Sequence, residues 1–367
     1  MVVYGWPLPN SIVIIQLESP KMTVDPKPDG LVMLFTSKYS RLLWPMLLWL
    51  LAFWSGCSTI NSYLGADGDY LLKAYDQLAL PGEKSQLHAR LESGTIQRDL
   101  PNRRIRFRGP GWFLRTTTTD DEGYAVTDFT PRRPGNYIFT IEVETTGLES
   151  RPPQPVELLV TCRASAEPMI IVDLDKTLAQ TRSWRFFTKN PAPMPGSVAV
   201  MRRLAKDYTV VYVTHRPQQY AHQTKVWLRT RGYPRGPLLM PEVIDFARGS
   251  RRYKTKELRH LKNKFPNIRI GIGDKIADAL AYHGNGLKSF LILDSAECDD
   301  PEDYLELAQE LDRLPADVQV VYNWPQIESA IYQGQSFPRS AAQEELRKKS
   351  EALRYDIIQK QSRKGES

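Results

Sequence analysis

The pattern of apolar and polar positions changes twice along the chain. Between about residues 84 and 160, short runs alternate apolar and polar residues with a period of two, separated by turn sequences such as Asp-Glu-Gly and Arg-Pro-Gly. Such alternation is typical of half-buried strands, so we expect a small antiparallel β-sandwich. From residue 168 onward, short apolar runs alternate with stretches of helical periodicity. This second pattern predicts an α/β region with a doubly wound parallel sheet.

These changes divide the chain into five segments. We expect an N-terminal extension with a lipoprotein-type signal or anchor over 1–57, a linker over 58–82, the sandwich over 83–163, the α/β domain over 167–335 and a polar helical tail over 336–367. The sequences Thr-Thr-Asp-Asp-Glu-Gly-Tyr-Ala and Pro-Gly-Asn-Tyr of the third segment resemble immunoglobulin-like or transthyretin-like extracellular modules. No catalytic constellation stands out in that segment, which predicts a packing or spacing role.

Polar residues follow three apolar runs of the α/β segment. In an open α/β sheet, ligands bind outside the carboxyl ends of the strands, so these side chains are expected at the site of the chemistry. Two carboxylates spaced at i and i+2 can divide nucleophilic attack from proton transfer, and both can face one Mg²⁺. Asp173 and Asp175 follow the first run, Thr214 follows the second, and Asp274 and Asp278 follow the third. A basic helix precedes the third run and contributes Lys254.

Simpler readings exist for several of these residues. An Asp-rich turn after a strand needs no catalytic role, and Lys254 could lie on a solvated helix face, since Lys256 stands two residues away. Asp278 could be an ordinary acid near a helix N-terminus. His215 and Arg216 follow Thr214 directly and could only shape the loop.

The order and spacing of these motifs resemble haloacid-dehalogenase (HAD) superfamily phosphatases. Residues 233–239, Tyr-Pro-Arg-Gly-Pro-Leu-Leu, and the basic stretch over 253–266, which contains the helix expected over 254–264, are similar to the catalytic domain of lipin-type phosphatidate phosphatases. The related membrane-associated phosphatidylinositol-transfer proteins carry a similar domain. An immunoglobulin-like module directly before the catalytic domain also fits that group.

The resemblance implies roles that suit the chemistry of each residue. Asp173 would attack phosphorus, and Asp175 would protonate the leaving oxygen and later activate water. Thr214 and Lys254 would bind and stabilise the phosphoryl group, with Arg216 as a further substrate-binding residue. The expected function is therefore a phosphohydrolase that forms an aspartyl phosphate.

The expected cofactor is Mg²⁺. Its predicted ligands are Asp173, Asp175 through its backbone carbonyl, Asp274 and Asp278. Lys176 departs from the resemblance, because lipin-like enzymes often carry Gly at this position. A cation there could help to bind an anionic substrate or could obstruct it.

The short intervals between the strand ends leave no room for a large cap domain, so we expect a capless, open site. An open site suits substrates presented by a surface, which favours phosphatidate or a related lipid phosphate. Two alternatives remain: a phosphatase for soluble or polymeric phosphoesters, and a non-catalytic phosphatidate-binding module. The intact Asp173 and Asp175 pair favours catalysis.

An apolar run over 42–54 follows Lys38 and Arg41 and ends in Ser-Gly-Cys at Cys57. This order is typical of a signal peptide, and its end resembles a bacterial lipobox in which Cys57 would be acylated. The alternative is an uncleaved anchor, because no charge appears between residues 42 and 65. Either reading predicts a membrane-anchored, extracytoplasmic protein on the periplasmic side. Ser58 after the cysteine favours export onward to the outer membrane.

Composition adds little. A hydrophobic content of 41% and a charged content of 25% are ordinary for globular proteins. The net charge of +7 is spread along the sequence, so we expect no nucleic-acid partner. The three cysteines are too widely spaced for a metal signature or a disulfide framework. The oligomeric state is left open.

Overall fold

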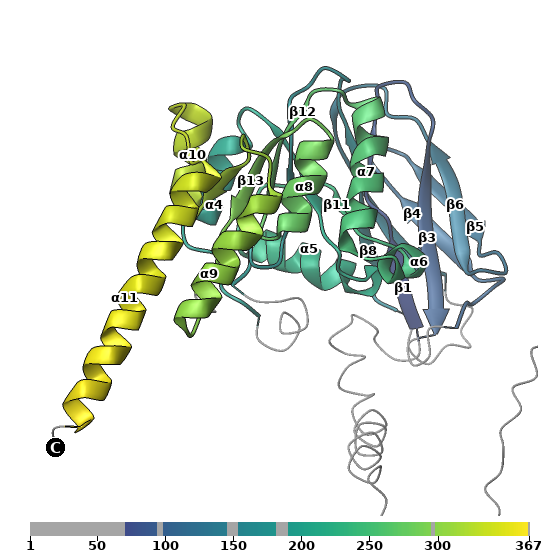
Figure 1. Ribbon diagram of the computed structural model, residues 1–367. Coiled ribbons are helices and arrows are strands. Elements are labelled where there is room, and N and C mark those ends of the chain that lie inside the picture. Colours follow the sequence, from purple (N-terminus) through teal and green to yellow (C-terminus); the bar gives the residue numbers. More distant parts are fainter. Residues whose placement is uncertain (1–69, 94–97, 145–152, 181–189, 295–297, 366–367) are drawn as a thin grey trace, which may run out of the picture. The chain divides into compact units, whose positions relative to one another are not determined.

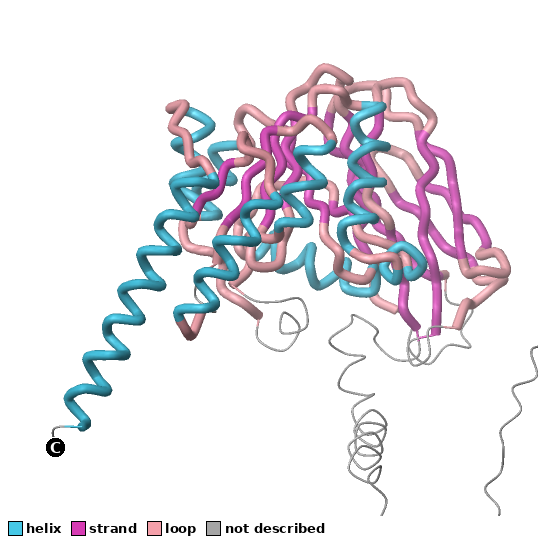
Figure 2. The backbone as a smooth tube through the Cα atoms, viewed as in Figure 1, coloured by secondary structure: helices cyan, strands magenta, loops and turns pink. Residues whose placement is uncertain are grey.

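The computed structural model describes residues 70–93, 98–144, 153–180, 190–294 and 298–365. All of them belong to one compact unit of the chain, Trp54–Ser367. An all-β region comes first and a mixed α/β region follows it (Figures 1 and 2). The predicted signal or anchor and Cys57 lie outside the described residues. Within these ranges, no helix has the length and apolar character that a membrane crossing requires.

The all-β region consists of two sheets that share one core. The first sheet has the order β1 (Tyr70–Ala74), β3 (Ser85–Ser93) and β6 (Tyr124–Phe129). The second has the order β2 (Gln77–Ala79), β8 (Val156–Cys162), β7 (Gly135–Val143), β4 (Arg104–Arg108) and β5 (Leu114–Thr118). Inward-facing residues of both sheets, such as Leu87, Phe107 and Phe139, form one buried cluster. The predicted antiparallel all-β region is confirmed, with one parallel pair, β2 and β8, at its edge.

Strands β1 and β2 lie within residues 58–82, where the sequence predicted a linker. Leu72 and Ala74 of β1 belong to the sandwich core, and Leu78 of β2 packs in a cluster with helices of the α/β region. With five and three residues, these strands are too short to show a clear alternating pattern. The sandwich therefore begins earlier than the change in sequence pattern indicated.

The α/β region is built on a six-stranded parallel sheet, as the apolar runs predicted. Its order is β11 (Leu238–Leu239), β10 (Thr209–Val213), β9 (Met169–Val172), β12 (Ile268–Gly273), β13 (Lys288–Ile292) and β14 (Gln319–Val321). Strand β9 pairs in parallel with both β10 and β12, and all four of its residues are buried. Its run of apolar residues is explained by burial on both faces.

Helices cover both faces of this sheet (Figure 1). Residues of α4 (Ser197–Leu204), α5 (Ala221–Thr230) and α10 (Trp324–Tyr332) pack on the face that carries Ile170 and Val172. Residues of α7 (Ser250–Lys264) and α8 (Ile276–Gly284) pack on the opposite face, which carries Met169 and Ile171. The short helix α6 (Val243–Ala247) and the 3₁₀ turn η1 (Gln218–Tyr220) lie in the connections beyond β11 and β10.

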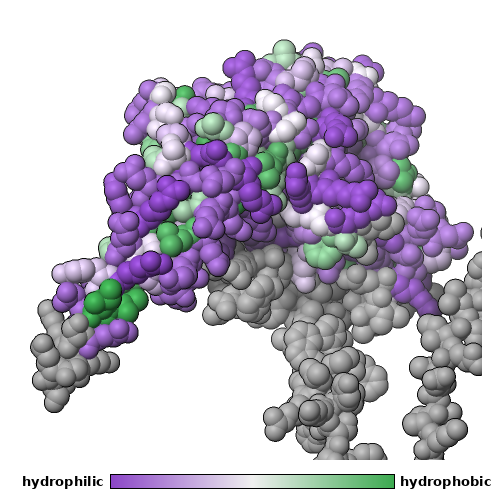
Figure 3. Space-filling model, viewed as in Figure 1, coloured by the Kyte–Doolittle hydropathy of each residue, from purple (hydrophilic) through white to green (hydrophobic). Residues whose placement is uncertain are grey.

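The C-terminal part of the chain packs against the far end of the sheet. Helices α9 (Pro301–Glu310) and α11 (Arg339–Gly365), with the turn η2 (Leu311–Arg313), surround a cluster that includes Leu346. The first half of the predicted polar helical tail over 336–367 is therefore packed, through Ala342 and Leu346 of α11. Its second half is exposed, and Figure 3 shows an apolar group there, where Ile357 and Ile358 are 37% and 58% exposed.

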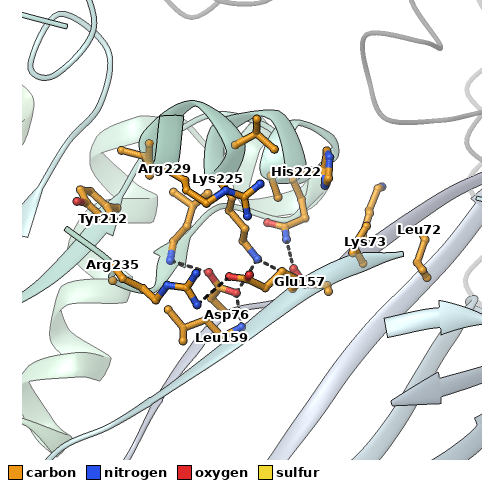
Figure 4. Close-up of a pocket in the computed structure, with 18 of the residues that line it drawn as sticks. Leu72, Lys73, Asp76, Glu157, Leu159, Tyr212, His222, Lys225, Arg229 and Arg235 are labelled. Carbon is orange, nitrogen blue, oxygen red and sulfur yellow. Dashed lines mark hydrogen bonds and ion pairs between the residues drawn. The ribbon is translucent and has the colours of Figure 1, made fainter. Parts of the chain in front are cut away.

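One buried carboxylate joins the two regions. Asp76, between β1 and β2, accepts hydrogen bonds from the backbone N–H of Leu159 in the sandwich at 2.8 Å and of Leu238 in β11 at 3.0 Å. The ammonium of Lys225 in α5 donates to the same side chain at 2.6 Å. Burial raises the pKa of Asp76, and Lys225 opposes that shift. These contacts line a cavity of about 340 Å³ between α5 and the sandwich (Figure 4).

Candidate active site

Three predicted strand ends meet at one edge of the parallel sheet. Asp173 follows β9, Thr214 follows β10 and Asp274 follows β12. Because β9 lies between β10 and β12 and pairs with both in parallel, the three residues emerge side by side. This is the edge at which α/β sheets bind ligands.

Lys254 reaches this edge from α7. Its Nζ lies 3.1 Å from Oδ2 of Asp173 and 2.8 Å from Oδ2 of Asp278, and its side chain is 1% exposed. Burial alone would lower the pKa of Lys254, but the charges of Asp173 and Asp278 outweigh it and raise the pKa well above its usual value. Lys256 is exposed instead and pairs with Asp245. The alternative that Lys254 lies on a solvated helix face is therefore wrong. Lys254 lies on the face of α7 that points into the protein.

Arg216 holds the second aspartate. Its Nη2 donates to Oδ1 of Asp175 at 2.7 Å and its Nε to Oδ2 at 3.1 Å, while Nη1 donates to Thr224 at 3.2 Å. The guanidinium is fully buried. The sequence predicted a substrate contact for Arg216, but this pairing directs the guanidinium towards Asp175. The arrangement fixes the orientation of that carboxylate.

Three carboxylates form a group that could hold a metal ion. One oxygen from each of Asp173, Asp274 and Asp278 lies within 4.8 Å of the others. Burial, with the charges of Asp173 and Asp278, raises the pKa of Asp274 well above its usual value. Burial likewise raises the pKa of Asp278 to about 6, against the opposing charge of Lys254. Oδ1 of Asp274 is buried and has no hydrogen-bond partner in the described part of the chain.

This donor set fits Mg²⁺. The ion prefers hard oxygen ligands, and a cation would offset the mutual repulsion of the three carboxylates. The side chain of Asp175 lies outside the group, because it points to Arg216. The predicted contribution of Asp175 through its backbone carbonyl stays a prediction.

The hydroxyl of Thr214 lies in a buried position at the end of β10. Its backbone N–H donates to the carbonyl of Leu239 at 3.1 Å, which fixes the residue at the end of β10. Within the described ranges, its hydroxyl is buried without a hydrogen-bond partner. A buried hydroxyl of this kind is able to donate to an acceptor that a ligand brings, such as a phosphoryl oxygen.

Lys176 stands at the rim of the site in an unusual conformation. Its φ of 54° lies in the left-handed region, which non-glycine residues seldom adopt. Its Nζ lies 3.2 Å from Oδ2 of Asp294, beyond the end of β13. The sequence reading missed Asp294, although it follows an apolar strand as Asp173 and Asp274 do. That position was the signal that could have found it.

Part of the α/β region matches a known family of domains. Residues 170–292 match the family model described as PITM 1-3, LNS2 domain, which is a lipin-like domain related to HAD-type phosphatases. The match covers about a third of the chain and includes every predicted catalytic residue. None of the curated proteins is similar enough to count as a match.

Solved structures resemble the chain only remotely. The CARDB domain of a Pyrococcus furiosus protein is 12% identical over 26% of this chain and 94% of its own, with a TM-score of 0.20. Fibronectin(III)-like modules of Clostridium thermocellum CbhA are 10% identical over 26% of this chain and 98% of their own, with a TM-score of 0.19. A chain of the Pnkp1/Rnl/Hen1 RNA repair complex is 17% identical over 41% of this chain and 47% of its own, with a TM-score of 0.32.

Proposed function

We propose that this protein is a Mg²⁺-dependent phosphohydrolase of the HAD type that forms an aspartyl phosphate on Asp173. The observation that carries the proposal is the buried network in which Lys254 contacts both Asp173 and Asp278. This network lies at the same edge of the sheet as Thr214, and Asp175 follows Asp173 by two positions in the sequence. In the proposed reaction these residues supply a nucleophile, an acid–base carboxylate, a cation and a hydroxyl donor.

In the first half of the reaction, a carboxylate oxygen of Asp173 attacks phosphorus. A bond forms from Asp173 to phosphorus, the bond from phosphorus to the leaving oxygen breaks, and that oxygen takes a proton from Asp175. Lys254 offsets negative charge on the transferring phosphoryl group, and the hydroxyl of Thr214 donates to one of its oxygens. The product of this step is the acyl phosphate of Asp173.

In the second half, Asp175 acts as a base. It takes a proton from water, whose oxygen attacks phosphorus, and the bond between phosphorus and Asp173 breaks to release inorganic phosphate. Asp175 is then protonated again for the next cycle. Arg216 keeps the Asp175 carboxylate in one orientation through both steps, since its two donors meet the two carboxylate oxygens.

Asp173, Asp274 and Asp278 would hold the metal ion. When bound, Mg²⁺ would offset the charge of the phosphoryl oxygens and of these carboxylates. The pairing of Asp278 with Lys254 gives Asp278 a second task, which is to fix the position of that ammonium.

We further propose that the substrate is phosphatidate or a related lipid phosphate. The described connections between β9 and β12 form only α4, η1, α5, β11, α6 and α7, with no separate domain over the site. An uncovered site can meet a headgroup at a membrane surface, and the match to an LNS2 domain supports a lipid ligand. The apolar N-terminal run and Cys57 would attach the chain to that membrane on its extracytoplasmic side.

A second candidate is a module that binds phosphatidate without turnover. The match to the PITM 1-3 group motivates it, because that match names a domain and not a reaction. The paired placement of Asp173 and Asp175 favours catalysis, since a binding site needs no proton donor beside its nucleophile.

Phosphate release decides between these functions. The purified full-length protein is assayed on phosphatidate in mixed micelles and on a panel of soluble phosphomonoesters, with Mg²⁺ or with EDTA. We expect Mg²⁺-dependent release that is greatest on phosphatidate, and a loss of about 10³-fold or more in Asp173→Asn, because an amide is not a nucleophile. Binding of phosphatidate without release by the wild type would establish the second candidate. Release from soluble esters alone would exclude the lipid substrate.

A further inference from the structure

A strongly basic groove lies on the outer side of the helix that carries Lys254. Of its nine lining residues, five are cationic and one is acidic. We call the five cations, together with the aromatic ring beside them, the α6–α7 patch: Phe246, Arg248, Arg251, Arg252, Lys256 and Arg259. Figure 1 places α6 beside the start of α7.

Most of this positive charge is not neutralised within the groove. Its acidic residue, Asp245, lies 2.8 Å from Lys256 and 3.5 Å from Arg248, so both of those cations have a partner. Arg251, Arg252 and Arg259 are exposed, and none forms an ion pair with a described residue. Three guanidinium groups therefore face solvent on one short surface.

An exposed aromatic ring connects the patch to the active site. Phe246 is 40% exposed, and its ring stacks on that of His215, with centroids 4.7 Å apart and planes 15° from parallel. His215 directly follows Thr214, the predicted phosphoryl donor. The patch thus begins one stacked ring away from the site, and α7 presents Lys254 inward and arginines outward.

We propose that the α6–α7 patch docks the active site onto an anionic lipid bilayer. Arg251, Arg252 and Arg259 contact lipid phosphates and carboxylates, and the ring of Phe246 enters the interface. Docking at this place brings the headgroups of the bilayer to the edge where Thr214 and Lys254 stand. The proposal rests on the proposed function and adds the surface on which the enzyme works.

The combination of groups favours a bilayer over other polyanions. A bilayer surface offers anionic headgroups for guanidinium groups and, directly beneath them, an apolar layer for a ring. Phe246 is exposed and lies between Asp245 and Arg248 in sequence, both of which line the groove, so the ring and the arginines can contact one bilayer at once. A soluble polyanion would use the arginines and leave the ring in water.

Quenching by brominated lipid tests this directly in the full-length protein. Phe246→Trp places an indole in the patch. The quantity measured is the quenching of tryptophan fluorescence by vesicles that contain brominated phosphatidylcholine, and the quenching of the wild type is subtracted from that of the variant. We expect additional quenching when the vesicles also contain phosphatidylserine. Adding Arg251→Glu and Arg252→Glu should reduce it to about a third or less, because both contacts become repulsive. Arg132→Glu with Arg133→Glu, an exposed pair in the sandwich with the same charge change, is the matched control and should retain it.

Several outcomes would overturn the proposal. The first is that no vesicle quenches the fluorescence of the introduced indole. The second is that the Arg251→Glu, Arg252→Glu variant and the Arg132→Glu, Arg133→Glu control show equal quenching. Salt-sensitive binding of the wild type to poly-glutamate, without quenching, would assign the patch to an acidic protein. The quenching does not depend on turnover. Absent quenching with normal phosphatidate turnover would reject the docking and leave the function, and quenching without turnover would reject the function and leave the docking.

Discussion

Nζ of Lys254 lies 2.8 Å from Oδ2 of Asp278, and both side chains are buried. Because the same ammonium lies 3.1 Å from Asp173, one cation serves two acids that have no access to bulk water. Removing one partner of a buried ion pair leaves an uncompensated charge, which costs more than the pair itself contributes. The network that places the nucleophile is therefore also expected to be important for stability.

Lys254→Met should lower the free energy of unfolding by about 3 kcal/mol in EDTA, because Asp173 and Asp278 lose their counter-charge. Chemical denaturation with and without Mg²⁺ measures this loss, and we expect Mg²⁺ to recover part of it. Lys256→Met, two residues along the same helix, is the control and should cost less than about 1 kcal/mol, since Lys256 is exposed. Equal losses in the two variants would contradict the network.

The contribution of Asp278 to the stability of the metal-free protein should fall as the pH rises from about 4 to about 6. A carboxyl whose pKa is raised in the folded state binds its proton more tightly there, so the folded state is favoured at low pH and this contribution is lost at higher pH. For Asp278, with a pKa of about 6, the loss amounts to about 3 kcal/mol. Unfolding in EDTA of the wild type and of Asp278→Asn across this range gives the difference. A difference that does not change with pH would contradict the prediction.

Asp274→Ala should shift the Mg²⁺ activation curve to higher concentration by about tenfold or more, with a smaller effect on substrate affinity, because a hard oxygen ligand is lost. Phosphate release measured against Mg²⁺ concentration checks it. The exposed Asp317→Ala is the control. An unchanged activation curve would remove Asp274 from the metal site.

Arg216→Lys should lower kcat by about 10-fold to 100-fold and leave KM almost unchanged, because one ammonium cannot replace the two donors that orient Asp175. Steady-state kinetics separates the two constants. A substrate-binding role would instead raise KM, so this split distinguishes the observed pairing from the role that the sequence predicted. Arg203→Lys, at an exposed pair with Glu328, should change neither constant.

Asp76→Asn should lower the free energy of unfolding by about 3 kcal/mol, because Lys225 loses a buried counter-charge and one carboxylate oxygen becomes a donor. Thermal or chemical unfolding of the full chain measures it. Asp128→Asn, which affects an exposed pair with Lys84 in the same sandwich, should cost less than about 1 kcal/mol. A similar cost for both substitutions would mean that Asp76 does not join the two regions.

The order of the strand ends and the parallel sheet could be predicted, because their signals are local. A buried strand on both faces is apolar throughout, and the polar residue after it marks its end, as at Asp173 and Asp274. The inward position of Lys254 follows from helical periodicity with Leu258 and Leu261, which share its buried face.

The partners of long side chains could not be predicted. Arg216 is next to Thr214 in sequence, yet its guanidinium is directed to Asp175, and no local pattern specifies that direction. Asp76 was missed for a related reason, since its partners Leu159, Lys225 and Leu238 come from three distant elements. Such contacts depend on how the two regions pack.

The junction at Asp76 also bears on how such a protein can change over evolutionary time. Domain shuffling is easiest when modules are joined by a tether that neither of them uses for folding. Here a single acid satisfies backbone groups of both modules and a lysine of the second. A different sandwich without an acid at this position would leave the N–H of Leu238 and the ammonium of Lys225 without this acceptor, so descendants should inherit the two modules as a pair and vary them in concert.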